Sequence, residues 1–156
     1  MIANMEKIEA RKRKFETNRT PSCMKIYLAG PMSGYDQSNF PLFDRVSKQL
    51  RAEGWEVVSP AELDNAEVRA AVMLNKPTRH TWGDYLSRDV KVIADGGVEG
   101  IIFLPQWFKS KGARLEGTVG LLKSKDFKFF RWDEDTEEVT PLRRGHVVVL
   151  IGAHTL

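Results

Sequence analysis

The sequence predicts an α/β fold, in which an open parallel sheet of four to five strands is covered by helices on both faces. Short, nearly continuous apolar runs alternate along the chain with segments whose apolar residues recur at helical spacing. This alternation is typical of parallel strands linked by crossover helices. A chain of 156 residues, 42% of them hydrophobic, is also long enough to bury a core within one domain. The predicted order is β-α-β-α-β-α-β.

The first half of the chain contains two predicted strands and one predicted helix. The run MKIYLAG begins at Met24 and stops at Gly30, as expected of a strand that is covered on both faces. Residues 39–54 have apolar side chains at helical spacing, a proline near the first turn and a glycine just past the end, which predicts a helix. Residues 55–60 predict a second strand. Residues 61–80 show no consistent period, so we expect a loop with room for a helical turn.

The second half continues the alternation. At Thr81 the sequence TWGD has the spacing of a capping box, and an apolar stripe follows it, so a second helix is predicted to begin there. Residues 100–105 predict a third strand, residues 112–124 a third helix and residues 127–132 a fourth strand. The run HVVVLIG, residues 146–152, predicts one more strand, which either completes the sheet or pairs with another subunit.

The chain divides into a basic N-terminal extension (residues 1–23), a body (residues 24–140) and a C-terminal tail (residues 141–156). Residues 1–24 hold six Lys or Arg and three Asp or Glu, which accounts for the whole formal charge of +3. Such an arm could contact nucleic acid or acidic lipid, but a solvated extension, or a start ahead of Met24, is the simpler interpretation. We therefore do not expect nucleic acid to be the partner.

Composition excludes several classes of protein. No apolar run approaches the roughly 20 residues that cross a bilayer, and no apolar segment follows the basic arm as it would in a secretory signal. The single cysteine, Cys23, cannot form a disulfide within the chain, and the cysteine and three histidines lack the spacing of metal ligands. We expect a cytoplasmic protein that uses no metal or cofactor and does not bind a membrane.

Two loops are candidates for a ligand site. In an open α/β sheet, ligands bind outside the carboxyl ends of the strands where the winding reverses, which here lies between the first and third strands. The loop GPMSG after the first strand contains the small residues Gly30, Ser33 and Gly34, whose backbone an anion can approach. An ordinary turn is the simpler interpretation of this loop taken alone.

The loop after the third strand is more strongly charged. Lys109, Lys111 and Arg114 surround the start of a helix near Gly112, and Ser110 lies among them. Both the cationic side chains and the positive end of the helix dipole favour an anion at this place.

Two acids, Asp89 and Glu116, each allow a structural and a functional interpretation. Asp89 projects from the apolar stripe of its helix, where a charge is costly unless it is paired or functional. A structural pair with Arg88 or Lys91 and a functional role are equally supported. Glu116 stands one turn into the third helix, and taken alone it is more simply interpreted as a solvated surface acid.

Three motifs, IYLAGPMSG, LSRDV and KSKGARLEG, follow one another with fitting spacing. Together they resemble the nucleoside 2-deoxyribosyltransferase superfamily, and within it the DUF4406 group, small proteins of unassigned function that are common in phage genomes. The resemblance spans residues 25–131 and implies a flavodoxin-like fold. It also implies an enzyme of nucleotide metabolism that cleaves the N-glycosidic bond of a small molecule, either a deoxynucleoside or a deoxynucleotide. Such an enzyme would be a nucleoside 2-deoxyribosyltransferase-like enzyme or a monophosphate N-glycosidase. The resemblance further implies a homo-oligomer.

The resemblance further implies roles for single residues. Glu116 matches the catalytic glutamate, Tyr27 the strand-one tyrosine beside it, and Asp89 an aspartate that orients the sugar and supports protonation of the base. Ser110 matches a serine that contacts phosphate in monophosphate-cleaving members. A carboxylate beside C1′ can stabilise an oxocarbenium-like state or bond to it, whereas the departing base needs a proton from a second acid. On this hypothesis the cations of residues 109–114 hold a 5′-phosphate.

The chain also departs from the family pattern. Glu99 stands near the place of an aspartate at the start of the third strand, and Pro31 stands where monophosphate hydrolases often have serine. A non-catalytic nucleotide-binding protein on the same fold is therefore the alternative hypothesis. Trp82, Trp107 and Phe108 could stack on a base, and each could equally pack in the core.

Overall fold

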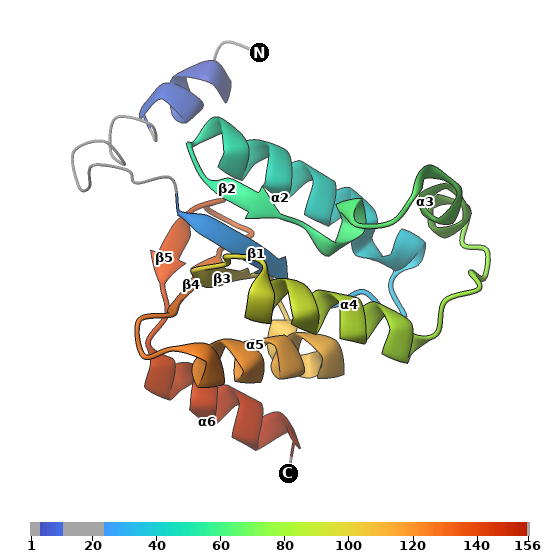
Figure 1. Ribbon diagram of the computed structural model, residues 1–156. Coiled ribbons are helices and arrows are strands. Elements are labelled where there is room, and N and C mark those ends of the chain that lie inside the picture. The colour runs from blue at the N-terminus through green and yellow to red at the C-terminus, as the bar shows by residue number, and fades with distance from the viewer. Residues whose placement is uncertain (1–3, 11–23, 156) are drawn as a thin grey trace.

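The computed structural model describes residues 4–10 and 24–155 and has an α/β fold with a five-stranded, mostly parallel open sheet (Figure 1). The strand order is β2-β1-β3-β4-β5. The strands are β1 (Lys25–Ala29), β2 (Glu56–Val58), β3 (Gly100–Phe103), β4 (Lys128–Trp132) and β5 (Val139–Pro141). The first four strands run parallel, and β5 pairs with β4 in the antiparallel direction. The predicted fold class is thus confirmed.

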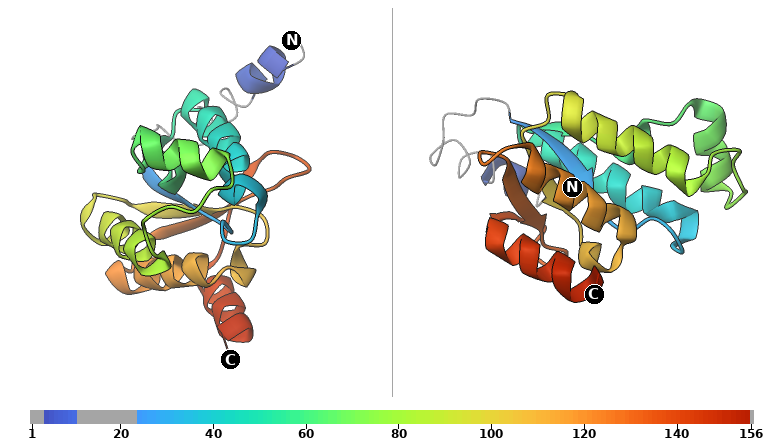
Figure 2. Two further views of the ribbon diagram at one scale, coloured as in Figure 1. Left: turned by 90° about the vertical axis from the view of Figure 1, so that its right-hand side faces the viewer. Right: turned by 60° about the horizontal axis from the view of Figure 1, so that its bottom comes forward.

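Helices cover both faces of the sheet, with α2 on one face and α4 and α5 on the other (Figures 1 and 2). The helices are α2 (Phe40–Ala52), α3 (Ala66–Met73), α4 (Trp82–Asp95), α5 (Lys111–Lys123) and α6 (Arg144–Thr155). Short 3₁₀ helices lie in the connections: η1 (Asp36–Asn39), η2 (Pro60–Glu62) and η3 (Trp107–Lys109). Residues 4–10 are also helical. None of the described helices has both the length and the apolar character needed to cross a bilayer.

The central strand β1 divides its side chains between two hydrophobic cores, because successive residues of a strand point to opposite faces. Ile26 and Leu28 join the core beneath α2, while Tyr27 and Ala29 join the core beneath α4 and α5. All four side chains are fully buried. The register of β1 therefore places the Tyr27 phenol on the same side of the sheet as the helices that carry Asp89 and Glu116.

Two helices were predicted from clear local signals, and both are confirmed. The apolar residues of α2 are buried against the sheet: Phe40, Phe43, Val46 and Leu50. Helix α4 begins with the predicted capping box. The Thr81 hydroxyl accepts the backbone N–H of Asp84 at 3.2 Å, and the Asp84 carboxylate accepts the backbone N–H of Thr81 at 2.7 Å.

Residues 61–80 contain more helix than the sequence predicts. Helix α3 spans eight residues where we expected a loop with room for one turn. Its first turn is stabilised by Asn65, whose side-chain oxygen accepts the backbone N–H of Val68 at 2.9 Å. Val68 and Val72, which lie one turn apart, are the buried residues of this helix. The sequence pattern of this helix is an N-cap residue followed by one pair of apolar residues, and one pair is too few to reveal a helical period.

The strand predicted over residues 146–152 is wrong, because this run belongs to helix α6. Val147 is fully buried, whereas Val148 and Val149 are 54% and 65% exposed. That pattern is typical of a helix with one face on a core. A short apolar run does not distinguish a buried strand from a helix by its period, and here the fifth strand is instead β5, from earlier in the chain.

Arg144 shows why the tail forms a helix at this place. Its guanidinium donates to the carbonyl oxygens of Phe127 and Leu121, each at 2.9 Å, and so fixes the start of α6 beside the end of α5. Cys23 and most of the basic run of the N-terminal extension lie outside the described residues.

Helix α5 lies close to the sheet because it presents small residues to it. A Cβ atom at Gly120 would lie 2.5 Å from the ring of buried Phe127. We therefore expect Gly120→Ala to lower the free energy of unfolding by about 1–3 kcal/mol through overpacking. Chemical denaturation measures this change. Gly152→Ala is the matched control in α6: its added Cβ meets nothing within 4 Å, so helix propensity should raise stability by up to about 1 kcal/mol. Equal effects of both substitutions would contradict the close approach of α5.

Candidate active site

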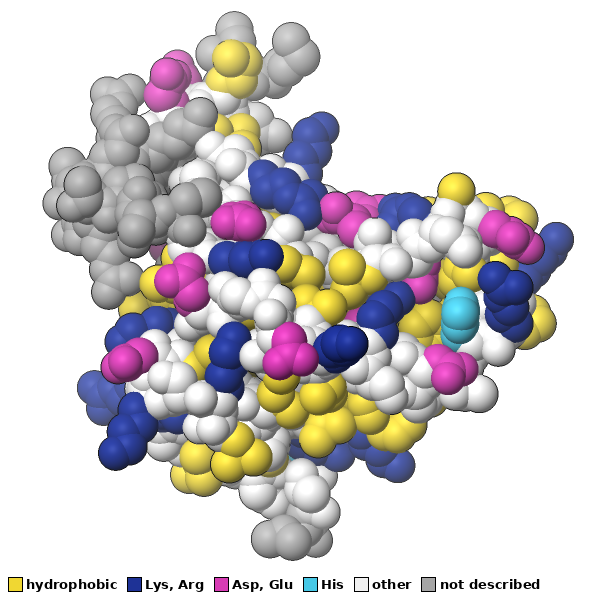
Figure 3. All heavy atoms as spheres, viewed as in Figure 1, with side chains coloured by type: hydrophobic (Ala, Val, Ile, Leu, Met, Phe, Trp, Pro, Cys, Tyr) yellow, Lys and Arg dark blue, Asp and Glu magenta, His cyan; other side chains and the backbone are white. Residues whose placement is uncertain are grey.

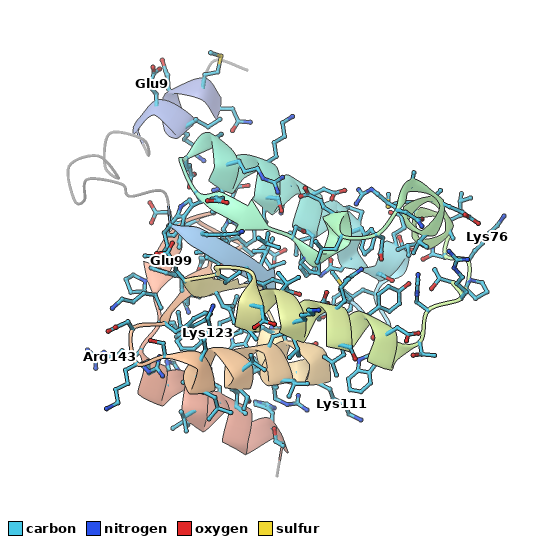
Figure 4. All side chains as sticks on the ribbon, viewed as in Figure 1. Glu9, Lys76, Glu99, Lys111, Lys123 and Arg143 are labelled. Atoms are coloured by element: carbon cyan, nitrogen blue, oxygen red, sulfur yellow. The ribbon has the colours of Figure 1, made fainter. Side chains whose placement is uncertain are left out.

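A cavity of about 720 Å³ opens at the carboxyl ends of the parallel strands. Its walls come from the loop after β1, the segment after β2, the connection between α3 and α4, and the first two turns of α4 and α5. Among its lining residues, those with charged side chains are Asp64, Lys76, Arg88, Asp89, Lys109, Lys111 and Glu116. Figure 4 shows Lys76 and Lys111 on the side of the molecule towards which β1 points. The sequence predicts a ligand crevice at this edge of the sheet.

Glu116 lines the cavity and is in contact with Tyr27, which lies buried beneath it and does not line the cavity. The Tyr27 hydroxyl donates a hydrogen bond of 2.9 Å to Oε1 of Glu116. Tyr27 is fully buried and Glu116 is 6% exposed. The interpretation of Glu116 as a solvated surface acid is therefore wrong. The side chain is buried because it shares the inward face of α5 with Ala113 and Gly117, which lets the helix lie against the sheet.

The second acid, Asp89, is held by an arginine. The Nε of Arg88 donates to Oδ1 of Asp89 at 2.8 Å, and Nη1 of the same guanidinium donates to Oδ1 of Asp64 at 2.6 Å. Nη2 donates to the carbonyl oxygen of Pro60 at 3.3 Å. The pair with Arg88 that the sequence offered as a structural explanation is present. Asp89 nevertheless lines the cavity and is 6% exposed.

Burial raises the proton affinity of all three central groups. It raises the pKa of Glu116 well above its ordinary value, and the nearby charge of Asp89 adds to this rise. Burial also raises the pKa of Asp89, but the hydrogen bond and charge of Arg88 oppose this rise. The pKa of the Tyr27 phenol is raised well above its usual range by burial and then by the charges of Glu116 and Asp89. Tyr27 is therefore a neutral hydrogen-bond donor.

The loop after β1 contributes Gly30 and Ser33 to the cavity wall, whereas Gly34 does not line it. Gly30 is required by a close approach, since a Cβ there would lie 2.8 Å from Cβ of Leu104. Gly34 has a φ of +83°, which suits glycine in the turn that follows. Gly34 therefore shapes the loop after β1 and does not contact a ligand in the cavity directly.

The loop before α5 contributes four of the five predicted anion-binding residues to the cavity wall, namely Lys109, Ser110, Lys111 and Gly112. Ser110 is the N-cap of α5, and its hydroxyl oxygen accepts the backbone N–H of Ala113 at 3.2 Å. The hydroxyl hydrogen remains able to donate to a ligand. The side chains of both lysines are exposed at the rim.

Arg114, the fifth predicted residue, does not line the cavity. Its guanidinium donates to the carbonyl oxygen of Phe108 at 2.9 Å and to the hydroxyl of Thr155 at 3.1 Å. Arg114 therefore joins the loop before α5 to the end of α6. On the face seen in Figure 3, Lys and Arg side chains are interspersed with Asp and Glu side chains.

The three aromatic residues that could stack on a base, Trp82, Trp107 and Phe108, lie in different places. Trp107 is 5% exposed and stacks on Phe103 with ring centroids 3.8 Å apart. Phe108 lies beside His154, with ring centroids 4.8 Å apart, and is not among the lining residues. Trp82 lines the cavity and is 55% exposed. Of the three, Trp82 is the one that a planar ligand could reach.

Glu99, which the sequence resemblance placed near an aspartate position, lies at the opposite end of the sheet (Figure 4). Its carboxylate accepts the backbone N–H of Lys25 at 2.9 Å and so supports the start of β1. It cannot take part in chemistry at the cavity.

The sequence did not indicate the wall formed by residues 35–39 and 73–78. Tyr35 lines the cavity and is 45% exposed. Asn75 also lines it: its amide donates to Asp36 at 2.8 Å and accepts the backbone N–H of Gln37 at 2.7 Å. Only the folded chain brings these two loops together. Within the part of the chain that the structure describes, no cluster of three or more His, Cys, Asp or Glu could hold a metal ion.

These features define an open α/β protein with two buried acids in a ligand-sized cavity at the carboxyl edge of its sheet. Residues 24–127 match the model of the family described as Domain of unknown function (DUF4406), and the chain belongs to that family. No curated protein and no solved structure matches the chain.

Proposed function

We propose that the protein cleaves or transfers the N-glycosidic bond of a 2-deoxynucleoside or its 5′-monophosphate, with Glu116 as the nucleophile. The observation that carries this proposal is the 2.9 Å hydrogen bond that the buried Tyr27 donates to Glu116, which lines the cavity. The motifs around both residues resemble those of the nucleoside 2-deoxyribosyltransferase superfamily. Tyr27 and Glu116 are 89 positions apart in the sequence, and folding brings them into contact. A contact between these two residues is what the resemblance predicts, so it supports the proposal.

The proposed reaction assigns different tasks to the two acids. The Glu116 carboxylate bonds to C1′ as the bond from C1′ to the base nitrogen breaks, and the electron pair of that bond leaves with the base. Asp89 gives the base a proton, so that the base departs neutral. Water or a second base then displaces Glu116 from C1′. Tyr27 orients the glutamate throughout by its hydrogen bond.

The rim formed by Lys109, Ser110 and Lys111 supports a 5′-phosphate as part of the ligand. Two lysine ammonium groups and the first backbone N–H groups of α5 meet there, and each favours an anion. A free nucleoside would leave this charged rim without a partner. We therefore favour a monophosphate.

Ser110 offers a test of the phosphate end. Ser110→Asp keeps an acceptor for the N-cap hydrogen bond but places a negative charge at the rim. We expect KM for a deoxynucleoside monophosphate to rise about tenfold or more through like-charge repulsion, with little change for the matching nucleoside. The measurement is steady-state kinetics on both ligands. Ser110→Ala is the control for loss of the cap, and should lower the free energy of unfolding by about 1 kcal/mol.

The direct test of the proposed function uses the native protein. It is incubated with a panel of deoxynucleosides and their 5′-monophosphates, and free base is separated by chromatography. Release of base from at least one member, absent from a protein-free blank, supports the proposal. If no deoxynucleotide yields free base while one of them binds in calorimetry, the catalytic proposal is wrong.

A non-catalytic nucleotide-binding protein is the second candidate, and one observation favours it. The pKa of Glu116 is raised well above its ordinary value by burial, and a protonated glutamate donates hydrogen bonds instead of attacking carbon. Such a site could hold a nucleotide without turning it over. The same panel distinguishes the two candidates, because a binding protein retains its ligand intact.

A further inference from the structure

The two acids of the cavity have unequal surroundings. Asp89 accepts a hydrogen bond from the Arg88 guanidinium at 2.8 Å. Glu116 accepts one from the neutral Tyr27 hydroxyl at 2.9 Å, and among the described residues no cation forms an ion pair with it. Both acids are equally buried, at 6% exposure. A carboxylate beside a guanidinium is stabilised as an anion, whereas a buried carboxyl group without one retains its proton more readily.

Arg88 is itself fixed in place. Asp64, whose side chain is 5% exposed, accepts a second hydrogen bond from the guanidinium at 2.6 Å, and Pro60 accepts a third through its carbonyl oxygen. The guanidinium also lies over the Tyr85 ring, with its carbon 5.3 Å from the ring centroid. Contacts from the segment after β2 and from α4 itself therefore hold the cation against Asp89.

We propose that in the ligand-free protein the acid pair holds its proton on Glu116, and that Arg88, anchored by Asp64, is the positioning residue that keeps Asp89 as a carboxylate. The charged and titratable groups around the pair come from several elements. Tyr27 comes from β1, Asp64 from the segment after η2, and Arg88 from α4. Lys109 and Lys111 lie at the rim of the same cavity, before and at the start of α5.

The arrangement has a chemical consequence that rests on the proposed function. Attack on C1′ requires Glu116 as a carboxylate, and protonation of the base requires Asp89 as an acid, which is the reverse of the ligand-free arrangement. One proton must therefore pass from Glu116 to Asp89 before the reaction. The Tyr27 hydroxyl donates to Glu116 in the structure and also interacts with Asp89. Once its hydrogen turns towards Asp89, the phenol oxygen can accept the proton of Glu116 while the phenol gives its own proton to Asp89. The charge of the pair is unchanged by this transfer.

A ligand can drive the transfer through Arg88, which lines the cavity. A ligand oxygen that accepts a hydrogen bond from the guanidinium competes with Asp89 for it, and so weakens the stabilisation of the Asp89 carboxylate. Glu116 then becomes a nucleophile only when the cavity is occupied. Such a device protects a reactive carboxylate in the empty site.

Carbon-13 NMR of the side-chain carboxyl groups tests where the proton lies. The ligand-free protein is titrated from about pH 4 to about pH 9, a range that spans ordinary and raised carboxyl values. Glu116→Gln and Asp89→Asn assign the two resonances. We expect Asp89 to ionise first, and Glu116 to remain protonated at pH values where Asp89 is already a carboxylate. The reverse order would overturn the proposal.

Two substitutions at Arg88 test the positioning role. Arg88→Gln removes the cation and should raise the pKa of Asp89 by about one unit or more. Arg88→Lys keeps a charge and should give a smaller rise. Circular dichroism establishes that each variant is folded before it is titrated. An Asp89 pKa that is unchanged in folded Arg88→Gln would contradict the role of Arg88. These readouts use no substrate, so they remain decisive if the protein releases no base.

Discussion

Replacing Glu116 with glutamine is expected to reduce the rate of base release by about 10³-fold or more, the scale of effect seen when a nucleophile is removed. Glutamine has nearly the same shape, and its amide oxygen can still accept the hydrogen bond from Tyr27. The cavity should therefore keep its form and its ligand affinity. The loss would fall on kcat, because the missing bond to C1′ forms only during the reaction.

Chromatographic assay of free base and calorimetric binding of the same ligand measure the two effects separately. Glu67→Gln is the matched control, since Glu67 is exposed in the first turn of α3 and does not line the cavity. It should leave both quantities unchanged. Base release by Glu116→Gln at the native rate would falsify the nucleophile assignment.

The same substitution is expected to increase stability at neutral pH, and the increase should depend on pH. Burial raises the pKa of Glu116 well above its ordinary value of 4.5, so between these two values the folded state binds more protons than the unfolded state. The contribution of this group to the free energy of unfolding is complete below the ordinary value and is lost as pH rises through the folded-state value. Glutamine does not titrate and avoids this loss. Every tenfold change in proton affinity corresponds to about 1.4 kcal/mol of free energy.

Urea denaturation at a series of pH values measures this effect. The difference in free energy of unfolding between Glu116→Gln and the native protein should grow from mildly acidic to neutral pH. Glu67→Gln again serves as the control, because it makes the same change at an exposed position. A difference that is independent of pH would mean that Glu116 titrates normally in the folded protein. Greater stability with lower activity would identify Glu116 as a group retained for its chemistry.

The sequence predicted secondary structure correctly where an apolar pattern was long or where residues typical of helix or strand ends marked its limits. The apolar run of β1 and the capping box at Thr81 predicted their elements correctly, and the alternation of strands and helices predicted the open sheet. The cavity edge followed from that topology. The contact of Tyr27 with Glu116 could not be derived from periodicity, because it depends on which face of β1 meets which face of α5. Its expectation came from the resemblance of the motifs.

Other features depend on contacts that are distant in the sequence. The apolar residues of α6 have the composition of a strand, and only the contacts of Arg144 with the end of α5 and the burial of Val147 show a helix. Arg114 has the spacing of a phosphate ligand but is occupied by Phe108 and Thr155. Charge near a helix start therefore predicted that a basic rim lines the cavity, but it did not predict the position of Arg114.

The two outer strands of the sheet limit how copies of this chain can associate. Both β2 and β5 are three residues long, and the proline at the end of β5, Pro141, has no N–H to offer an incoming strand. Short edge strands, and a proline on one of them, resist the edge-to-edge pairing of sheets that leads to aggregates. The exposed apolar area that the structure offers near the C-terminus lies instead on a helix, where Val148 and Val149 of α6 point outwards.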